Sequence, residues 1–144
     1  MSATLRQALR EDIPAMHRVR LAVAENRLAS PEVSEAAYVP AIEHTGRGWV
    51  IDVDGEVAAF AIGNKVTGNV WALFVDPGCE GRGYGRRLLE VMTSWLFSRG
   101  VTRAWLSTEP HTRAEKFYQA AGWTFKGILS NGEAGYELRN PAAP

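Results

Sequence analysis

Residues 78–87 combine four glycines with three arginines in the sequence GCEGRGYGRR. The stretch lies between an apolar run and an amphipathic one, so it is expected to connect a strand to the start of a helix. The first turn of a helix exposes unpaired backbone N–H groups, and glycines let a phosphate approach them closely. The residue types and their spacing therefore predict a site for a ligand that carries phosphate.

Two common phosphate-binding motifs do not fit this spacing. Gly78 and Gly83 have the separation of a P-loop, but Tyr84 stands where that motif requires a lysine. The dinucleotide-binding fingerprint requires a third glycine at the position of Arg86 or Leu88. Both classes of nucleotide-binding protein are therefore disfavoured. For the glycines alone, a tight strand-to-helix turn without a ligand is the simplest alternative.

The segment EGRGYG resembles the pyrophosphate-binding motif of the GCN5-related N-acetyltransferase (GNAT) family, in which Gln or Arg, two residues, Gly, one residue and Gly or Ala open a helix. Gly83 and Gly85 match, but Glu80 does not, and its carboxylate is expected to point away from the phosphates. The segment HTRAEKFYQAAGW is similar to the second signature of the family, with Tyr118 at a matching position and His111 in place of an Asn. Together the two motifs imply that the loop binds the pyrophosphate of acetyl-CoA.

The resemblance implies an acetyl-CoA-dependent N-acetyltransferase that moves the acetyl group directly to a primary amine of a small molecule or peptide. Its partners are then acetyl-CoA and an amine acceptor, and no metal ion is expected. A non-catalytic module of the same fold that senses CoA or acyl-CoA is the alternative, because the sequence offers no obvious general base. The residues that the resemblance places at the cofactor are Leu73, Phe74, Val75, Gly81, Arg82, Gly83, Tyr84, Gly85, Arg86 and His111.

Tyr118 is the general-acid candidate by resemblance. A phenol has a reference pKa of about 10, so it is protonated at neutral pH and can donate a proton to a departing thiolate. The stretches expected to flank the thioester contain no carboxylate, and the nearest is Glu109 at the end of a predicted strand. We therefore expect an acceptor amine of low pKa that loses its proton through water, with Glu109 assisting at most. Trp71 and residues 25–33 are expected near the acceptor.

The hydrophobic pattern predicts the elements that must position these residues. Segments with helical spacing lie at 10–28, 30–48, 85–100 and 112–123. Segments with the composition or alternation of strands lie at 4–9, 48–53, 56–63, 69–75, 103–110, 124–130 and 133–140. The expected fold is a mixed α/β domain over residues 1–144, with a mainly antiparallel twisted sheet of about six to seven strands flanked by about four helices.

Local signals predict where some of these elements begin and end. Asp54-Gly55 separates two alternating segments and predicts a hairpin with a type I′ turn, and Asn131-Gly132 is a second hairpin signal. Thr112 and Glu115 have the spacing of a capping box. We therefore expect the last helix to begin directly after Thr112.

The overall composition limits the classes of partner. Sixteen basic and sixteen acidic residues leave no net charge that would favour nucleic acid or an anionic membrane. No run approaches the roughly 18 apolar residues of a membrane span, and the lone Cys79 excludes an intramolecular disulfide. A cytoplasmic protein is therefore expected, and a predicted edge strand near the C-terminus could pair with a second copy in a homodimer.

Overall fold

The structure, a computed structural model, describes residues 2–24 and 33–143. The described part contains seven strands, four α-helices and three short 3₁₀ helices. In chain order the strands and α-helices are β1 (Ala3–Gln7), α1 (Ile13–Ala24), α2 (Tyr38–Glu43), β2 (Gly46–Val53), β3 (Glu56–Asn64), β4 (Val70–Val75), α3 (Tyr84–Ser98), β5 (Arg103–Thr108), α4 (Arg113–Ala120), β6 (Thr124–Ile128) and β7 (Ala134–Arg139). The 3₁₀ helices are Arg10–Asp12, Glu35–Ala37 and Pro77–Cys79.

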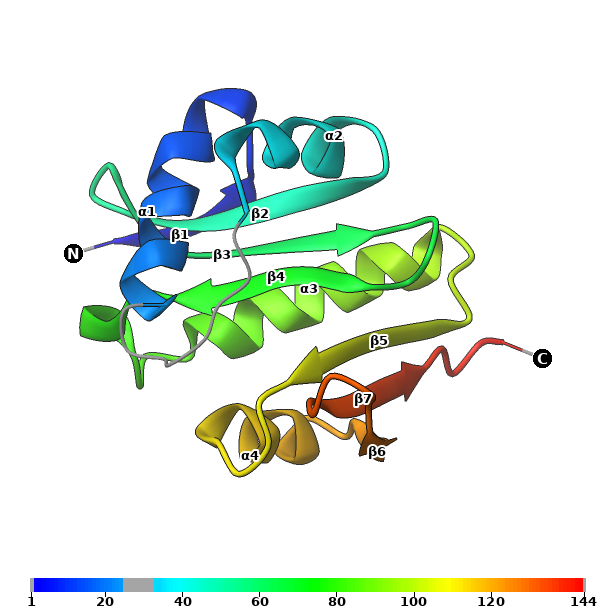
Figure 1. Cartoon of the computed structure of the whole chain (residues 1–144). Helices are drawn as coiled ribbons and strands as arrows, with labels where there is room; N and C mark the ends of the chain where they lie inside the picture. Colours follow the sequence, from blue (N-terminus) through cyan, green and yellow to red (C-terminus); the bar gives the residue numbers. More distant parts are fainter. Residues whose placement is uncertain (1, 25–32, 144) are drawn as a thin grey trace.

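The strands form two antiparallel sheets, one in the order β1-β2-β3-β4 and the other in the order β5-β7-β6. Within the described residues a single parallel bridge, between Asn69 and Trp105, links them. Figure 1 shows β4 and β5 running in the same direction and moving apart beyond this bridge. The mixed α/β class and its mainly antiparallel sheet are confirmed. β6 is a free edge, and the homodimer that the sequence suggests through such an edge stays a prediction.

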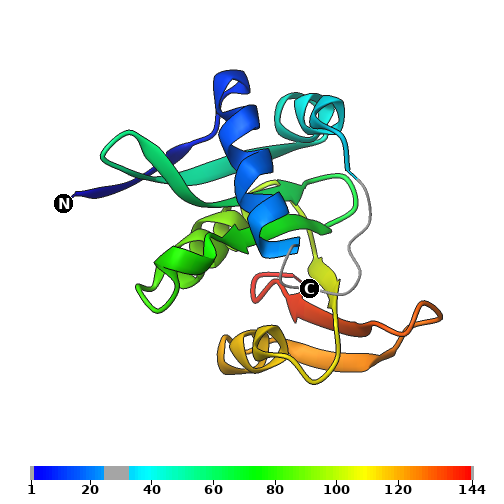
Figure 2. The same cartoon turned by 60° about the vertical axis from the view of Figure 1, so that its left-hand side comes forward.

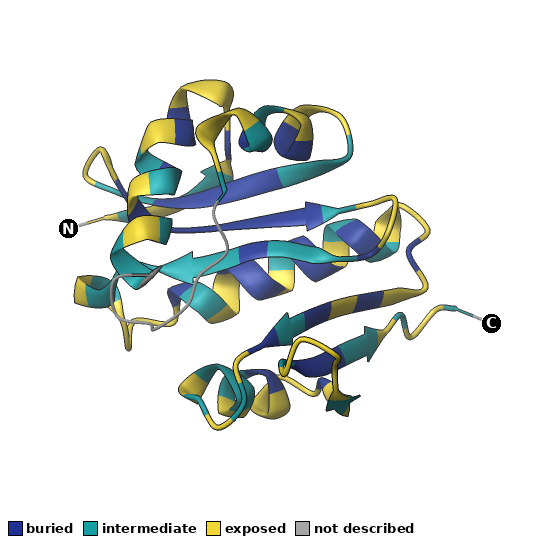
Figure 3. Ribbon diagram, viewed as in Figure 1, coloured by how far each residue is buried: buried dark blue, intermediate teal, exposed yellow. Residues whose placement is uncertain are grey.

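Helices cover both faces of the four-stranded sheet, with α1 and α2 on one face and α3 on the other (Figures 1 and 2). The amphipathic pattern explains this arrangement, since Leu88, Met92 and Leu96 of α3 recur at helical spacing and are fully buried. Met16 and Val19 do the same for α1. β3 lies between the two cores and is buried along nearly its whole length (Figure 3). None of the helices in the described ranges is long and apolar enough to cross a membrane.

Both predicted hairpins form, but only the first has a two-residue turn. Asp54 (φ 52°) and Gly55 (φ 91°) both have positive φ, as a type I′ turn requires. β6 and β7 are instead joined by residues 129–133, in which the backbone N–H of Leu129 donates to the carbonyl of Glu133. The side chain of Asn131 accepts from the N–H of Glu133, which stabilises this wider loop.

The predicted capping box at the start of α4 does not form. The hydroxyl of Thr112 donates to the carbonyl oxygen of Glu109. His111 has a left-handed backbone (φ 62°), and its N–H donates to the carboxylate of Glu115. Glu115 therefore still satisfies a donor at the helix start, but one residue earlier than the capping box would.

Candidate active site

β4 offers a free backbone edge where it separates from β5. In its pairing with β3, Val70 lies opposite Gly63 and Ala72 lies opposite Ile62, so Trp71 is the extra residue of a β-bulge. Trp71 and Ala72 accordingly both pack toward α1 and α2. Beyond Asn69 no strand of the described chain pairs with the outer edge of β4. An extended ligand can therefore use the backbone groups that follow the bulge.

The glycine-rich loop follows β4 directly. Gly81 (φ 78°) and Gly83 (φ 81°) adopt left-handed backbone conformations, and Gly83 is the N-cap of α3. A Cβ atom added at either position would meet nothing within 4 Å, so these positions face open space. No acidic residue lies in the first turn of α3. The loop thus presents bare backbone and the positive end of a helix dipole to any ligand above it.

Glu80, which was expected to point away from the phosphates, lines the cavity at this loop and forms an ion pair there. Its carboxylate lies 3.1 Å from Nη1 of Arg113 in α4, and both residues line the same cavity as the glycines. Arg113 offsets the negative charge that a phosphate would otherwise meet at this position. The two side chains are 46% and 87% exposed, so the ion pair contributes little to stability.

One cavity, here called the loop cavity, has a volume of about 630 Å³. It extends from the glycine-rich loop along β4 to Phe117 and Tyr118 of α4. Arg82 and His111 are exposed and line neither this cavity nor the second one. The predicted cofactor residues that do line the loop cavity are Leu73, Phe74, Val75, Gly81, Gly83, Tyr84, Gly85 and Arg86.

The second cavity, here called the strand cavity, has a volume of about 680 Å³ and lies between β4 and β5. Trp71, expected near the acceptor, lines it. Of the residues predicted for the acceptor wall, 25–32 lie outside the described residues, and α1 contributes Arg20 and Val23 to the lining. Both volumes are within the range of small-molecule sites, roughly 300–1,000 Å³.

Tyr118 lies where the two cavities meet, because it lines both of them. Its side chain is only 7% exposed. The rings of Phe117, Trp123 and Tyr136 surround it, with centroids 5.1, 5.6 and 6.4 Å away. This packing fixes the position of the phenol, as a proton donor requires.

A polar network on β7 and α4 supports this packing. The hydroxyl of Tyr136 donates to the carboxylate of Glu115 and accepts from the amide of Gln119, 2.9 Å away. The hydrogen bond to Glu115, together with burial, raises the pKa of Tyr136. The same bond and the N–H of His111 lower the pKa of Glu115. The network ties β7 to α4 and so holds Tyr118 against the strands.

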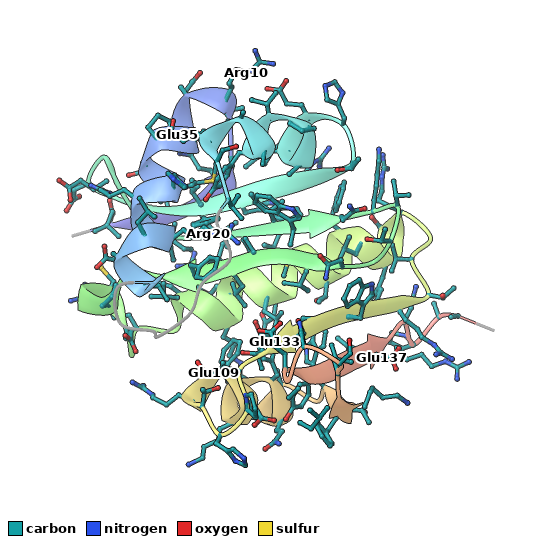
Figure 4. The ribbon with its side chains drawn as sticks, viewed as in Figure 1. Arg10, Arg20, Glu35, Glu109, Glu133 and Glu137 are labelled. Atoms are coloured by element: carbon teal, nitrogen blue, oxygen red, sulfur yellow. The ribbon has the colours of Figure 1, made fainter. Side chains whose placement is uncertain are left out.

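Two carboxylates line the strand cavity, and only one was predicted. Glu109 follows β5 and is exposed, as expected from the sequence. Glu133 comes from the loop between β6 and β7, where it accepts hydrogen bonds from Ser107 (2.8 Å) and Asn131 (3.1 Å). Figure 4 shows both carboxylates at the β5 side of the site. No local sequence signal marks Glu133, because only the antiparallel pairing of β5 with β7 places its loop beside Ser107.

A free cysteine and the absence of a metal cluster complete the description of the site. Cys79 is half-buried and lines the loop cavity. Within the ranges that the structure describes, no three His, Cys, Asp or Glu side chains are grouped so that they could hold a metal ion. Among the described residues, the phenol of Tyr118 and the carboxylates of Glu109 and Glu133 line the strand cavity and are placed for chemistry there.

Residues 6–123 match the model of the acetyltransferase (GNAT) family, and the chain belongs to this family. Acetyl-CoA is the co-substrate of the family. The loop cavity fits this molecule, because its glycines leave room for a pyrophosphate beside backbone N–H groups and β4 offers a free edge to the extended arm.

The names of individual relatives state different acceptors. The chain is 32% identical to serotonin N-acetyltransferase 2, chloroplastic, of Oryza sativa subsp. japonica, over 78% of this chain and 59% of the relative. It is 37% identical to mycothiol acetyltransferase of Beutenbergia cavernae, over 53% of this chain and 28% of the relative. The chain thus spans less than two thirds of the length of these relatives. The fold is also that of ribosomal-protein-S18-alanine N-acetyltransferase from Escherichia coli, with a TM-score of 0.75, 24% identity and coverage of 99% and 97% of the two chains.

Proposed function

We propose that this chain is an acetyl-CoA-dependent N-acetyltransferase that acetylates a primary amine of a small molecule or peptide by direct transfer. The observation that carries the proposal is the position of Tyr118, which lines both the loop cavity and the strand cavity. A proton donor at this junction can serve a reaction between a ligand in each cavity. A site that only sensed CoA would need the loop cavity alone.

In this proposal the loop cavity binds acetyl-CoA, which supplies an activated acetyl thioester. Backbone groups of Gly81, Gly83 and the first turn of α3 bind its pyrophosphate, and the edge of β4 orients its extended arm. The amine enters through the strand cavity. A nitrogen–carbon bond forms to the acetyl group as the carbon–sulfur bond breaks. Tyr118 gives its proton to the departing thiolate, and the amine loses one proton to water or to a carboxylate of the cavity.

The proposed acceptor is an amine of low pKa. A lysine amine, with a reference pKa of about 10.4, is neutral in about one molecule in 2,500 at pH 7, whereas an α-amine with a pKa of about 7.7–8.0 is neutral in roughly one in ten. Glu133 already accepts hydrogen bonds from Ser107 and Asn131, so its carboxylate is engaged by donors other than the amine. An acceptor that is already partly neutral therefore needs the least help from this site.

The proposal is tested by incubating the protein with acetyl-CoA and a panel of amines while the release of free thiol is followed. We expect thiol release to depend on an amine, and the acetylated product to be found by mass spectrometry. We also expect acetyl-CoA, but neither NAD nor ATP, to raise the melting temperature. Binding of acetyl-CoA without amine-dependent thiol release would favour the CoA-sensing alternative.

A further inference from the structure

Arg20 gives the strand cavity a positively charged wall. It projects from α1 and lines the cavity together with Trp71 and Phe74. Its guanidinium carbon lies 5.1 Å from the centroid of the Trp71 ring and 4.9 Å from that of Phe74. Contact with two aromatic rings restricts the movement of the guanidinium group, and a guanidinium held in place is suited to binding a carboxylate.

The charge of Arg20 is not neutralised by the described part of the chain. Its Nε and Nη1 atoms are buried and have no hydrogen-bond partner there. The ion pairs of the described residues all involve other basic side chains. Burial raises the pKa of Tyr38, and both Arg20 and Glu35 also affect this pKa, but Glu35 does not line the cavity. A partly desolvated cation of this kind is costly unless an anion binds to it.

The opposite side of the strand cavity is negatively charged. Glu109 and Glu133 lie there, beyond the gap between β4 and β5 (Figure 4). Tyr118 lines the same cavity at its junction with the loop cavity. A cationic amine is therefore attracted to the end of the cavity that carries the carboxylates, and an anionic group to the end that carries Arg20.

We propose that the acceptor is a small molecule that carries both a primary amine and a carboxylate. The carboxylate binds Arg20, and the amine lies between the two glutamates and Tyr118. This inference rests on the proposed acetyltransferase function and defines its substrate class. It also gives Arg20 a role in specificity, since a neutral acceptor would leave the guanidinium group unpaired in the closed complex.

The test compares acceptors that differ only in the carboxylate. Alanylglycine and alanylglycinamide, and the corresponding pair with one more glycine, have the same N-terminal α-amine but a charged or a neutral C-terminus. Of the two peptides with a free carboxylate, we consider the one that is the better acceptor. We expect its kcat/KM to exceed that of its amide by about tenfold or more, because a charged hydrogen-bonded pair is lost with the amide. Arg20→Gln should abolish this preference, and Arg20→Lys should retain part of it.

Arg18→Gln is the matched control, because Arg18 lies on the same helix, is exposed and does not line the cavity. It should keep the preference of the unchanged protein. All variants should keep the rise in melting temperature with acetyl-CoA, which shows that each one is folded. Equal kcat/KM values for acid and amide, or a preference that survives Arg20→Gln, would overturn the inference.

Two further outcomes separate this inference from the proposed function. If acetyl-CoA binds and amines without a carboxylate are acetylated equally well, only the substrate class is wrong. If acetyl-CoA neither binds nor is consumed with any amine, the acetyltransferase function itself is wrong. Where turnover of both the acid and the amide is too slow to measure, the shift in melting temperature caused by each peptide in the presence of CoA is compared instead of kcat/KM. Equal shifts, or no shift with either peptide, then overturn the role of Arg20.

Discussion

Asn69 and Trp105 join the two sheets at one point, beside the opening between β4 and β5. The amide of Asn69 donates to the carbonyl of Trp105, 3.3 Å away, and the backbone N–H of Trp105 donates to the carbonyl of Gly68, 3.0 Å away. The indole N–H of Trp105 also donates to the carbonyl of Thr67, at 3.0 Å. These bonds fix β5 against β4 at one end, so the free edge of β4 and the strand cavity begin directly beside them.

Gly68→Ala should weaken this junction. Gly68 has a φ of 79°, and a Cβ atom added there would lie 2.3 Å from the carbonyl oxygen of Arg103. The left-handed backbone costs about 1–2 kcal/mol for a non-glycine residue, and the clash with β5 adds about 1–3 kcal/mol. Gly55→Ala is the control, because Gly55 has a φ of 91° and open space around it. Urea unfolding measures the free energy of unfolding of both variants. An equal loss of this free energy in the two variants would argue against a close contact between position 68 and Arg103.

Gly83→Val should abolish the rise in melting temperature with acetyl-CoA. The added side chain would occupy the open space above the loop, where the pyrophosphate is proposed to bind. Gly100→Val is a matched control at the other end of α3, since Gly100 also has positive φ and open surroundings but lines neither cavity. Both variants should lose similar stability, and only the second should still respond to acetyl-CoA. Normal binding of acetyl-CoA by Gly83→Val would contradict the proposed position of the pyrophosphate.

Much of the cofactor side could be predicted because its signals are local in the chain. A strand, a glycine-rich loop and the first turn of a helix follow one another within residues 70–85, and each leaves its own pattern in the sequence. Gly81 and Gly83 are needed for backbone conformations that other residues rarely adopt. Periodicity likewise predicted α3 and its buried face, because an amphipathic helix repeats its pattern regardless of its partners.

The strand cavity depends on pairings between distant segments, so the sequence predicted Trp71 and Glu109 there but neither Glu133 nor Arg20. Glu133 reaches Ser107 only because β7 pairs with β5 and a five-residue loop replaces the expected turn. In the sequence, Arg20 is one of several basic residues of the predicted helical segment 10–28. Its burial over Trp71 depends on a bulge in β4 that shifts the alternation of side chains by one residue. Neither feature has a signal within its own segment.

Tyr118→Phe should lower kcat while the binding of acetyl-CoA is unchanged. The ring keeps its contacts with Phe117, Trp123 and Tyr136, so the fold should be retained. Loss of a general acid costs roughly 10²–10⁴-fold, and we expect the low end because a thiolate is already a fair leaving group. Single-turnover rates with a good acceptor measure the effect. An unchanged rate would remove Tyr118 from the mechanism.

The stability of the protein should fall as the pH is lowered below about 4.5. Asp12 accepts hydrogen bonds from Arg6 and from the backbone N–H of Leu9, and these contacts lower its pKa from 3.8. The pKa of Glu115 is also lowered, from 4.5. A carboxylate whose pKa is lower in the folded state stabilises the protein above its unfolded pKa, and this contribution is lost as the pH falls through that value toward the folded pKa.

Thermal unfolding between pH 7 and pH 3 measures this dependence. Asp12→Asn should have a lower melting temperature at pH 7 and a shallower loss on acidification, because one of the responsible groups is absent. Glu11→Gln removes one exposed charge from the same turn and should follow the unchanged protein. Parallel curves for Asp12→Asn and the unchanged protein would show that Asp12 is not one of the groups responsible.

The last prediction concerns proton removal from the amine. We expect kcat/KM to rise with pH along the titration of the acceptor itself, because neither Glu109 nor Glu133 is placed as a strong base. Glu109 is exposed, and Glu133 already accepts hydrogen bonds from Ser107 and Asn131. Glu109→Gln should therefore cost less than about tenfold in kcat/KM.

Glu133→Gln should raise KM more than it lowers kcat, since its charge attracts the amine rather than removing the proton. Both variants should keep the pH profile of the unchanged protein. A loss beyond about a hundredfold in kcat, with a flattened pH profile and intact acetyl-CoA binding, would instead identify the substituted glutamate as the general base.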